Sequence, residues 1–159
     1  MADGPRTYDG WGYSPLGQSA TANVARLQPV WIASTGATNG HEAAALVNGG
    51  VLIVSTPGNQ VIALDARSGT VLWRYRRPIP EDAVVMHPTS RGVALYGDKV
   101  YLPANERVLV ALDARTGKEV WTANVGENQR TIGSISRGLR VTAQTNALRS
   151  GLTCTLSSS

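Results

Sequence analysis

The chain contains the same seven-residue segment twice, with one conservative change between the copies. Ala-Leu-Asp-Ala-Arg-Ser-Gly spans residues 63–69, and Ala-Leu-Asp-Ala-Arg-Thr-Gly spans residues 111–117. A tryptophan follows each copy in the same register, as Trp73 and Trp121. The two copies begin 48 residues apart. A period of about this length with one tryptophan per copy is typical of β-propellers and other arrays, whose units bury their apolar faces against their neighbours. The sequence therefore predicts part of an all-β array.

Each copy has the pattern of a β-hairpin. Short apolar runs rich in β-branched residues lie on both sides of the repeated Asp and Gly, as expected of buried strands joined by a tight turn. The expected strands span residues 61–64 and 71–75 in the first copy, and residues 108–112 and 119–121 in the second. We expect each Asp to accept amide hydrogens inside its turn and each Gly to adopt a positive φ. A repeated Asp is typical of a structural role rather than of a catalytic acid, and we interpret the tryptophans as packing between blades.

Length and composition restrict the class of protein. The 159 residues suffice for one domain or three to four such units, and no apolar run approaches the roughly 20 residues of a membrane span. The first residues, 1–5, lack the basic and apolar regions of a secretion signal. No partner of nucleic-acid type is expected, because the net charge of residues 1–129 is zero.

The composition changes near Gln129. The excess of four positive charges comes from arginines scattered in residues 130–159, a segment rich in Ser and Thr without acidic or aromatic residues. We predict a partial propeller domain over residues 1–129 and an irregular tail, disordered or non-native, over residues 130–159. The alternative, a basic arm for nucleic acid or an anionic surface, would require clustered arginines with interleaved aromatic residues. The single cysteine, Cys154, lies in this tail and excludes an intrachain disulfide.

Several ordered motifs resemble the pyrroloquinoline-quinone (PQQ)-dependent alcohol dehydrogenases. They begin with Trp-Gly-Tyr-Ser-Pro-Leu at 11–16 and continue with Asn-Val-Ala-Arg-Leu-Gln-Pro-Val-Trp at 23–31 and Ser-Thr-Gly at 34–36. Asn-Gly-His-Glu at 39–42 and Ser-Arg-Gly-Val-Ala at 90–94 follow in the same order as in that family. The resemblance covers roughly residues 8–128, together with both hairpins. It implies about two blades of an eight-bladed propeller that holds PQQ and a calcium or lanthanide ion.

The resemblance also names two cofactor-binding candidates, Glu42 and Arg91. Arg91 matches the family arginine that contacts the quinone, and a guanidinium can bind a carboxylate of PQQ in a bidentate fork. Glu42 matches a family glutamate that contacts the cofactor from the first blade. Without the resemblance, Arg91 reads as a surface arginine at a strand edge, and Glu42 as a loop residue beside His41, which stays unassigned.

One departure from the family lies just before Arg91. Many members place two adjacent cysteines there, joined as a ring beneath the quinone, whereas Val85 and Met86 occupy these positions here. The ring cannot form, although the soft thioether of Met86 could pack on the quinone face. The family's metal ligands and catalytic base come from later blades, so no catalytic or metal-binding residue is assigned in this chain.

The resulting expectation is the N-terminal part of a quinoprotein that oxidises alcohols by hydride transfer to PQQ, inactive by itself. In the full-length family the partners are a small alcohol and an electron-accepting cytochrome, and the location is the periplasm. Two alternatives stay open: a non-enzymatic propeller scaffold that binds proteins, and a small free-standing β module with a basic tail. Self-association through open blade edges is also expected, because a partial propeller leaves sheet edges uncovered.

Overall fold

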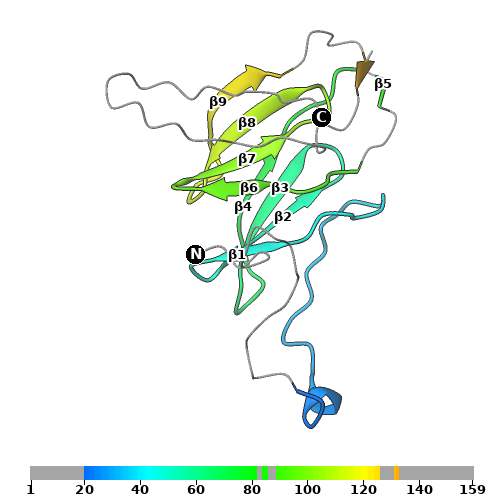
Figure 1. The fold of residues 1–159 in the computed structure, drawn as a ribbon, viewed down its shortest axis with the longest axis vertical. Coiled ribbons are helices and arrows are strands. Elements are labelled where there is room, and N and C mark those ends of the chain that lie inside the picture. Colours follow the sequence, from blue (N-terminus) through cyan, green and yellow to red (C-terminus); the bar gives the residue numbers. More distant parts are fainter. Residues whose placement is uncertain (1–19, 82–83, 86–88, 126–130, 133–159) are drawn as a thin grey trace, which may run out of the picture.

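The structure is a computed structural model that describes residues 20–81, 84–85, 89–125 and 131–132 (Figure 1). Almost all regular structure in these residues is β-strand, preceded by one short 3-10 turn, η1 (Val24–Arg26). The first sheet, here called sheet 1, contains β1 (Leu46–Asn48), β2 (Val51–Thr56), β3 (Gln60–Asp65) and β4 (Val71–Arg76). Sheet 2 contains β6 (Ala94–Tyr96), β7 (Lys99–Pro103), β8 (Val108–Asp113) and β9 (Glu119–Asn124).

Both sheets are antiparallel meanders in which each strand pairs with the next strand along the chain. A shift of register occurs at the same place in both, between Ala63 and Leu64 and between Ala111 and Leu112. A small additional pair joins β5 (Val84–Val85) to β10 (Thr131–Ile132) in parallel. The expected all-β class is therefore confirmed, with two open four-stranded units that have the form of propeller blades.

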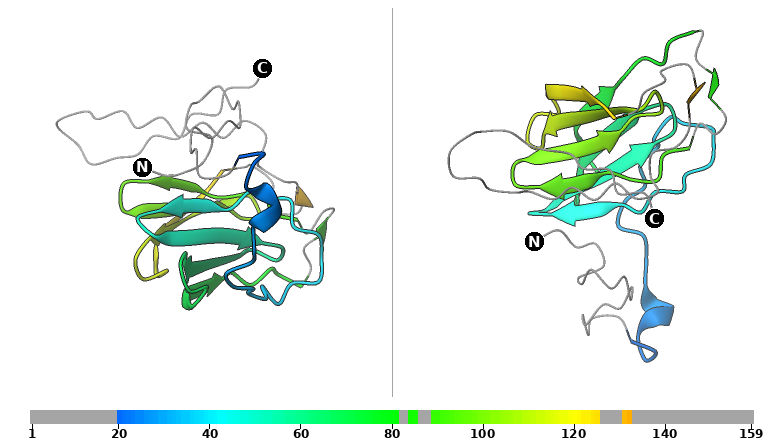
Figure 2. Two further views of the ribbon diagram at one scale, coloured as in Figure 1. Left: turned by 90° about the horizontal axis from the view of Figure 1, so that it is seen from below. Right: turned by 45° about the horizontal axis from the view of Figure 1, so that its top comes forward.

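The two sheets pack face against face, and the apolar core lies between them (Figures 1 and 2). Sheet 1 supplies Ile53, Val61, Ala63 and Trp73, and sheet 2 supplies Val100, Leu102, Val108, Val110 and Leu112. Successive side chains of a strand point to opposite faces, so alternate residues of β3, β7 and β8 reach the core between the sheets. Neither sheet could bury this surface alone, which agrees with the expected repeat architecture.

The repeated Asp-to-Gly segment forms the predicted turn in both sheets. Asp65 accepts hydrogen bonds from the backbone N–H of Arg67 and Ser68 at 3.0 and 2.8 Å, and from the Ser68 hydroxyl at 2.9 Å. Asp113 receives the equivalent bonds from residues 115 and 116, with both Thr116 bonds at 2.7 Å. The glycines that close these turns have φ of 72° and 69°. In each turn one carboxylate oxygen, Oδ1, accepts three hydrogen bonds, so the structural interpretation of the repeated Asp is confirmed.

Each turn also receives a tryptophan from the preceding element. The Trp73 indole N–H, on β4, donates to the carbonyl oxygen of Ala114 at 3.0 Å, and its ring covers Gly117 in the turn of sheet 2. Trp31 repeats this arrangement on sheet 1: its indole N–H donates to Ala66 at 3.1 Å, and its ring covers Gly69. The interpretation of these tryptophans as packing between units is thus confirmed for Trp73.

Trp31 lies on an extended arm that precedes sheet 1. The arm begins near η1, away from the sheets, and runs along the side of sheet 1 before it turns into β1 (Figures 1 and 2). Polar contacts attach its middle part: the Arg74 guanidinium donates to the carbonyl oxygens of Ser34 and Thr35 at 3.4 Å, and the Gln60 amide donates to Thr35 at 3.3 Å. In the part of the chain that the structure describes, the arm is therefore held by one docked indole and a few hydrogen bonds, and no strand pairs with it.

The predicted boundary at residue 129 stays a prediction, because residues 126–130 and 133–159 lie outside the described residues. The packing of Met86 on the quinone face also stays a prediction, because Met86 lies outside the described residues.

Candidate functional site

Strand register places the candidate residues at one end of the two sheets. The repeated Asp turns join β3 to β4 and β8 to β9 at the opposite end. Because β1 and β6 begin at the end where β2 and β7 finish, the segments that lead into them meet there. Glu42 lies in the segment before β1, and Arg91 lies in the segment before β6. The two expected cofactor-binding residues therefore come from equivalent places in neighbouring units.

The structure brings Glu42 and Arg91 into direct contact. Arg91 Nε lies 3.1 Å from Glu42 Oε2, which is an ion pair across the two units. Both side chains remain open to solvent, with 61% of Arg91 and 44% of Glu42 exposed. An exposed pair of this kind contributes little to folding, since water solvates both charges nearly as well. The arrangement thus keeps two charged groups accessible at the junction of the sheets.

Local backbone features set the positions of these two residues. His41 Nε2 lies 3.0 Å from the Thr35 hydroxyl oxygen, a hydrogen bond that closes the loop just before Glu42. On the other side, the backbone N–H of Gly92 donates to the Ser90 hydroxyl at 3.4 Å, and Gly92 has φ of 126°. His41, which the sequence left unassigned, is therefore a loop-closing residue in the structure.

The donor set of this pair fits an anionic ligand better than a metal. Glu42 contacts Arg91 at Nε, and no hydrogen bond from the Nη nitrogens of this exposed side chain is found within the described residues, so they can face a planar carboxylate. In the described ranges, with their gaps, no three His, Cys, Asp or Glu side chains lie close enough to hold a metal ion. The residues present could contact a polycarboxylate cofactor through Arg91, with Glu42 fixing the guanidinium.

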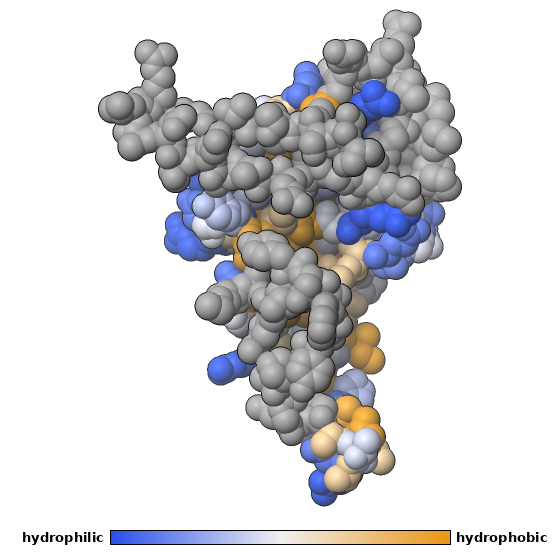
Figure 3. Space-filling model, in the orientation of Figure 1, coloured by the Kyte–Doolittle hydropathy of each residue, from blue (hydrophilic) through white to orange (hydrophobic). Residues whose placement is uncertain are grey.

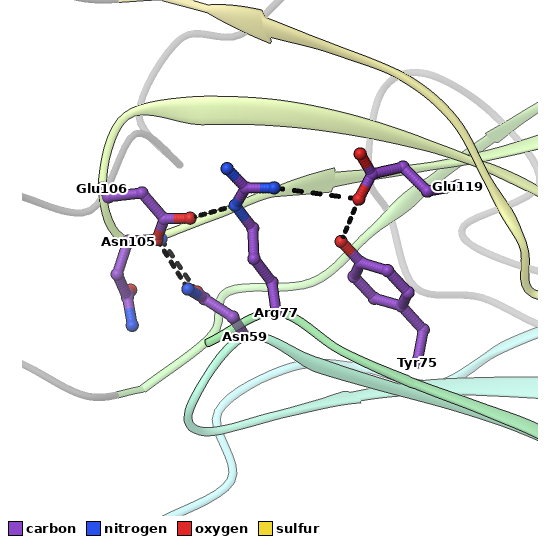
Figure 4. Close-up of polar contacts among 6 residues, drawn as sticks. All are labelled: Asn59, Tyr75, Arg77, Asn105, Glu106 and Glu119. Atoms are coloured by element: carbon purple, nitrogen blue, oxygen red, sulfur yellow. Dashed lines mark hydrogen bonds and ion pairs between the residues drawn. The ribbon is translucent and has the colours of Figure 1, made fainter. Parts of the chain in front are cut away.

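A second polar cluster at the same end links the sheets and was not foreseen from the sequence (Figure 4). The buried Glu106 carboxylate accepts a hydrogen bond from the Asn59 amide at 2.6 Å and forms an ion pair with Arg77 Nε. Asn59 Oδ1 in turn accepts from the Asn105 backbone N–H at 2.9 Å. Arg77 Nη1 lies 3.7 Å from Glu119 Oε2. This cluster ties the β2–β3 turn to the β7–β8 turn.

Tyr75 extends the cluster along β4. Its hydroxyl donates to Glu119 Oε2 at 2.7 Å. Burial and this bond to a carboxylate raise the pKa of the Tyr75 phenol to about 12, because both disfavour the tyrosinate. For Arg77, burial alone would lower the pKa, but the hydrogen bond to Glu106 and the nearby carboxylate charge raise it above its usual value. The guanidinium therefore stays charged in the interface.

A signal for this cluster exists in the repeat itself. Aligned by the shared Asp, the first copy has Tyr75 and Arg77 where the second has Ala123 and Val125. Such differences between otherwise matched copies indicate side chains, here Tyr75 and Arg77, that make contacts between the two sheets. Next to the cluster, a hollow of about 410 Å³ is lined by Gly58, Arg76, Arg77, Pro78 and Ile79. Neither Glu42 nor Arg91 lines this hollow.

Comparisons with known proteins agree with the blade-like architecture of the two sheets. A family model described as "Outer membrane protein assembly factor BamB" matches residues 28–159. A 1-butanol dehydrogenase (quinone) of Thauera butanivorans is 40% identical over 120 residues, which cover 74% of this chain and 19% of that protein. A quinohemoprotein alcohol dehydrogenase of Pseudomonas putida is 45% identical over 123 residues, which cover 74% of this chain and 17% of the relative.

Solved structures give the same result. The quinohemoprotein alcohol dehydrogenase from Comamonas testosteroni has a TM-score of 0.68 at 37% identity, covering 74% of this chain and 18% of that one. A europium-containing methanol dehydrogenase has a TM-score of 0.66 at 36% identity, covering 72% of this chain and 21% of that one. The fold and the tryptophan-docked turns thus define the chain as part of a β-propeller protein.

The family follows from these matches. The chain belongs to the PQQ propeller-repeat family, and the relatives that it matches are quinoprotein alcohol dehydrogenases. It spans about a fifth of the length of the curated relatives that it matches. The recognition made from the ordered motifs is confirmed, and the similarity to dehydrogenases does not favour a separate scaffold role.

Proposed function

We propose that this chain forms the N-terminal part of a quinoprotein alcohol dehydrogenase and supplies two contacts to its PQQ cofactor. The observation that carries the proposal is the ion pair between Arg91 Nε and Glu42 Oε2, which joins two residues that lie in separate motifs of the family resemblance. The similarity to dehydrogenases over most of the chain supports the same reading.

In the proposed site, Arg91 binds a carboxylate of the cofactor through its free Nη nitrogens. Glu42, the second proposed contact to the cofactor, also orients the guanidinium by holding Nε, so that less side-chain freedom is lost when the ligand arrives. PQQ, when bound, is the group that accepts hydride from the alcohol. We assign neither a catalytic base nor metal ligands to residues of this chain.

The remaining features of the enzyme are proposals from the same similarity. A small alcohol is the proposed substrate, and a calcium or lanthanide ion is the proposed metal of the full-length enzyme. A cytochrome is the proposed electron acceptor, supported by a relative named 1-butanol dehydrogenase (cytochrome c). The proposed location is the periplasm. In the described residues, no helix is long and apolar enough to cross a membrane.

A titration of the chain with PQQ, followed by the absorbance of the quinone, tests the two contacts. We expect weak, saturable binding that Arg91→Gln reduces about tenfold, the loss expected for a charge-assisted contact. Arg115→Gln is the matched control, because Arg115 is an exposed arginine in the turn at the opposite end of sheet 2. Equal binding by the Arg91→Gln variant and the parent chain would exclude Arg91 as a cofactor contact.

Self-association is tested separately. The outer strands β4 and β9 each have a partner on one side only within the described residues, so their open edges could pair between copies. Sedimentation velocity at increasing concentration should then show a growing population of dimers and larger species. A single monomeric species at all concentrations would contradict this expectation.

A further inference from the structure

The chain contains two Asn-Gly pairs, and the fold places them in different surroundings. Asn48-Gly49 lies at the β1–β2 hairpin, where Asn48 is the last residue of β1 and pairs with Val51 of β2. Strand pairing therefore fixes the backbone of Asn48, and Gly49 has φ of 57° in the turn. Asn39-Gly40 lies in the segment before β1, outside every strand of the described residues. The same dipeptide thus occurs once in a hairpin and once in a loop.

The loop leaves Asn39 and Gly40 open on all sides. Both residues are exposed, and within the described residues neither takes part in a hydrogen bond. A Cβ built on Gly40 meets no atom within 4 Å, so the space around its backbone is empty. Figure 3 shows hydrophilic surface on the right of the molecule, where the loop ahead of β1 lies in Figure 1. Water therefore reaches this dipeptide freely.

We propose that Asn39 is a site of spontaneous deamidation. Hydroxide removes the Gly40 N–H proton, and the nitrogen attacks Cγ of Asn39. The bond from Cγ to the side-chain nitrogen breaks, this nitrogen leaves as ammonia after taking a proton from water, and a five-membered succinimide remains. Water then opens the ring at Cγ to give an aspartyl residue, or at the backbone carbonyl carbon to give an isoaspartyl residue. The net reaction consumes one water and releases one ammonia, with no change of oxidation state.

The conformational freedom of the loop makes the reaction selective for Asn39. Ring closure requires the Gly40 nitrogen to approach the Asn39 Cγ, which needs rotation about the Asn39 backbone and a following residue without a Cβ. No strand pairing resists this rotation at Asn39 within the described residues. At Asn48 the same rotation breaks the pairing with β2, so the reaction there must wait for local opening of the hairpin.

The product changes the loop that leads to Glu42. The Thr35 hydroxyl and His41 Nε2, 3.0 Å apart, close this loop around position 39. An isoaspartyl linkage adds one atom to the main chain inside the closed loop, and both products add a negative charge three residues before Glu42. The proposal rests on the loop and not on the quinone site, so either can fail without the other.

The test follows both Asn-Gly pairs in one sample of the full chain, held folded in mildly alkaline buffer. Trypsin and a glutamate-specific protease together release residues 27–42 and 43–67, because these segments end at side chains that the two enzymes recognise. Asn39 lies in the first fragment and Asn48 in the second. Mass spectrometry measures the conversion of amide to acid in each fragment and locates it by fragment sequencing.

We expect Asn39 to convert at least about tenfold faster than Asn48 in the folded chain, because only Asn48 is protected by strand pairing. In concentrated urea the two rates should become similar, since the dipeptide is the same. Equal rates in the folded chain would overturn the proposal. It would also be overturned if Asn39 stayed unchanged while the unfolded chain reacted.

One variant tests the role of the glycine nitrogen. Gly40→Ala fits the fold, because the added Cβ meets nothing within 4 Å, yet it hinders the attack. It should slow conversion of Asn39 at least about tenfold, both in the folded chain and in urea. The control Thr38→Ala changes the residue on the other side of Asn39 and should leave the rate unchanged. An unchanged rate in Gly40→Ala would overturn the proposed route.

Discussion

The indole of Trp73 occupies the space that a side chain at Gly117 would need. A Cβ built on Gly117 would lie 2.5 Å from Trp73 Cε3, and the backbone there has φ of 69°. The glycine is therefore required twice, for its backbone conformation and for the close approach of the ring. This relation fixes how one sheet is positioned on the next, and it leads to the first prediction.

Gly117→Ala should lower the free energy of unfolding by about 3 kcal/mol, because it adds both left-handed strain and a clash with Trp73. The control is Gly97→Ala in the β6–β7 turn, where φ is 60° but nothing lies within 4 Å of the added Cβ. That variant should lose only about 1 kcal/mol from backbone strain. Urea denaturation of both variants measures the difference, and equal losses would show that the indole contact does not matter.

Glu106→Ala should destabilise the packing of sheet 1 on sheet 2 by about 3 kcal/mol. The substitution leaves the Arg77 guanidinium and the Asn59 amide without their buried acceptor. Glu119→Ala is the matched control, because Glu119 contacts the same arginine from a position that is open to solvent. It should cost no more than about 1 kcal/mol. Equal midpoints in thermal unfolding would contradict the importance of the buried acceptor.

Tyr75 should ionise later than an ordinary tyrosine as the pH rises. Its pKa is raised to about 12 by burial and by the bond to Glu119, so the folded state disfavours the tyrosinate. Its contribution to stability is present below the unfolded pKa of about 10 and is lost as the pH rises toward 12. The absorbance of tyrosinate in an alkaline titration should lose its last component in Tyr75→Phe. An unchanged titration curve would contradict the assignment.

A fall in pH should remove the contribution that the Asp65 and Asp113 carboxylates make to the stability of the fold. The Thr116 side-chain and backbone hydrogen bonds lower the pKa of Asp113 below its ordinary value, and the Ser68 bonds do the same for Asp65. A lowered pKa stabilises the fold above the unfolded pKa of about 3.9, and this stability is lost as the pH falls through the folded value. Asp113→Asn should therefore reduce the melting temperature at about pH 6 but not at about pH 2. An equal reduction at both values would argue against a role for the charge.

Local features of the fold could be predicted from the sequence, whereas contacts between units could not. The hairpins followed from short apolar runs rich in β-branched residues, and the Asp turns followed from the repeat, because each depends on residues close in sequence. The docking of Trp31 on Ala66 and Gly69 was missed, since the arm lacks a complete repeat around it.

The polar residues between the sheets illustrate the same limit. Glu106 and Arg77 lie where the two copies differ, so the repeat gave no template for their pairing. Glu42 and Arg91 were named through the family resemblance, but their mutual contact required the three-dimensional arrangement of the segments before β1 and β6. Pairing between distant segments depends on how the sheets pack, which no single stretch of sequence encodes.

Glu42→Gln should change the free energy of unfolding by less than about 0.5 kcal/mol, because its ion pair with Arg91 is open to solvent at both ends. The same substitution should weaken PQQ binding, since the neutral amide no longer holds the guanidinium by charge. Unfolding in urea and titration with the quinone separate the two effects on one protein sample. A loss of stability as large as that of Glu106→Ala would show that the Glu42–Arg91 pair mainly stabilises the packing of the two sheets. Unchanged stability with weakened quinone binding is the result expected of a pair that serves the cofactor.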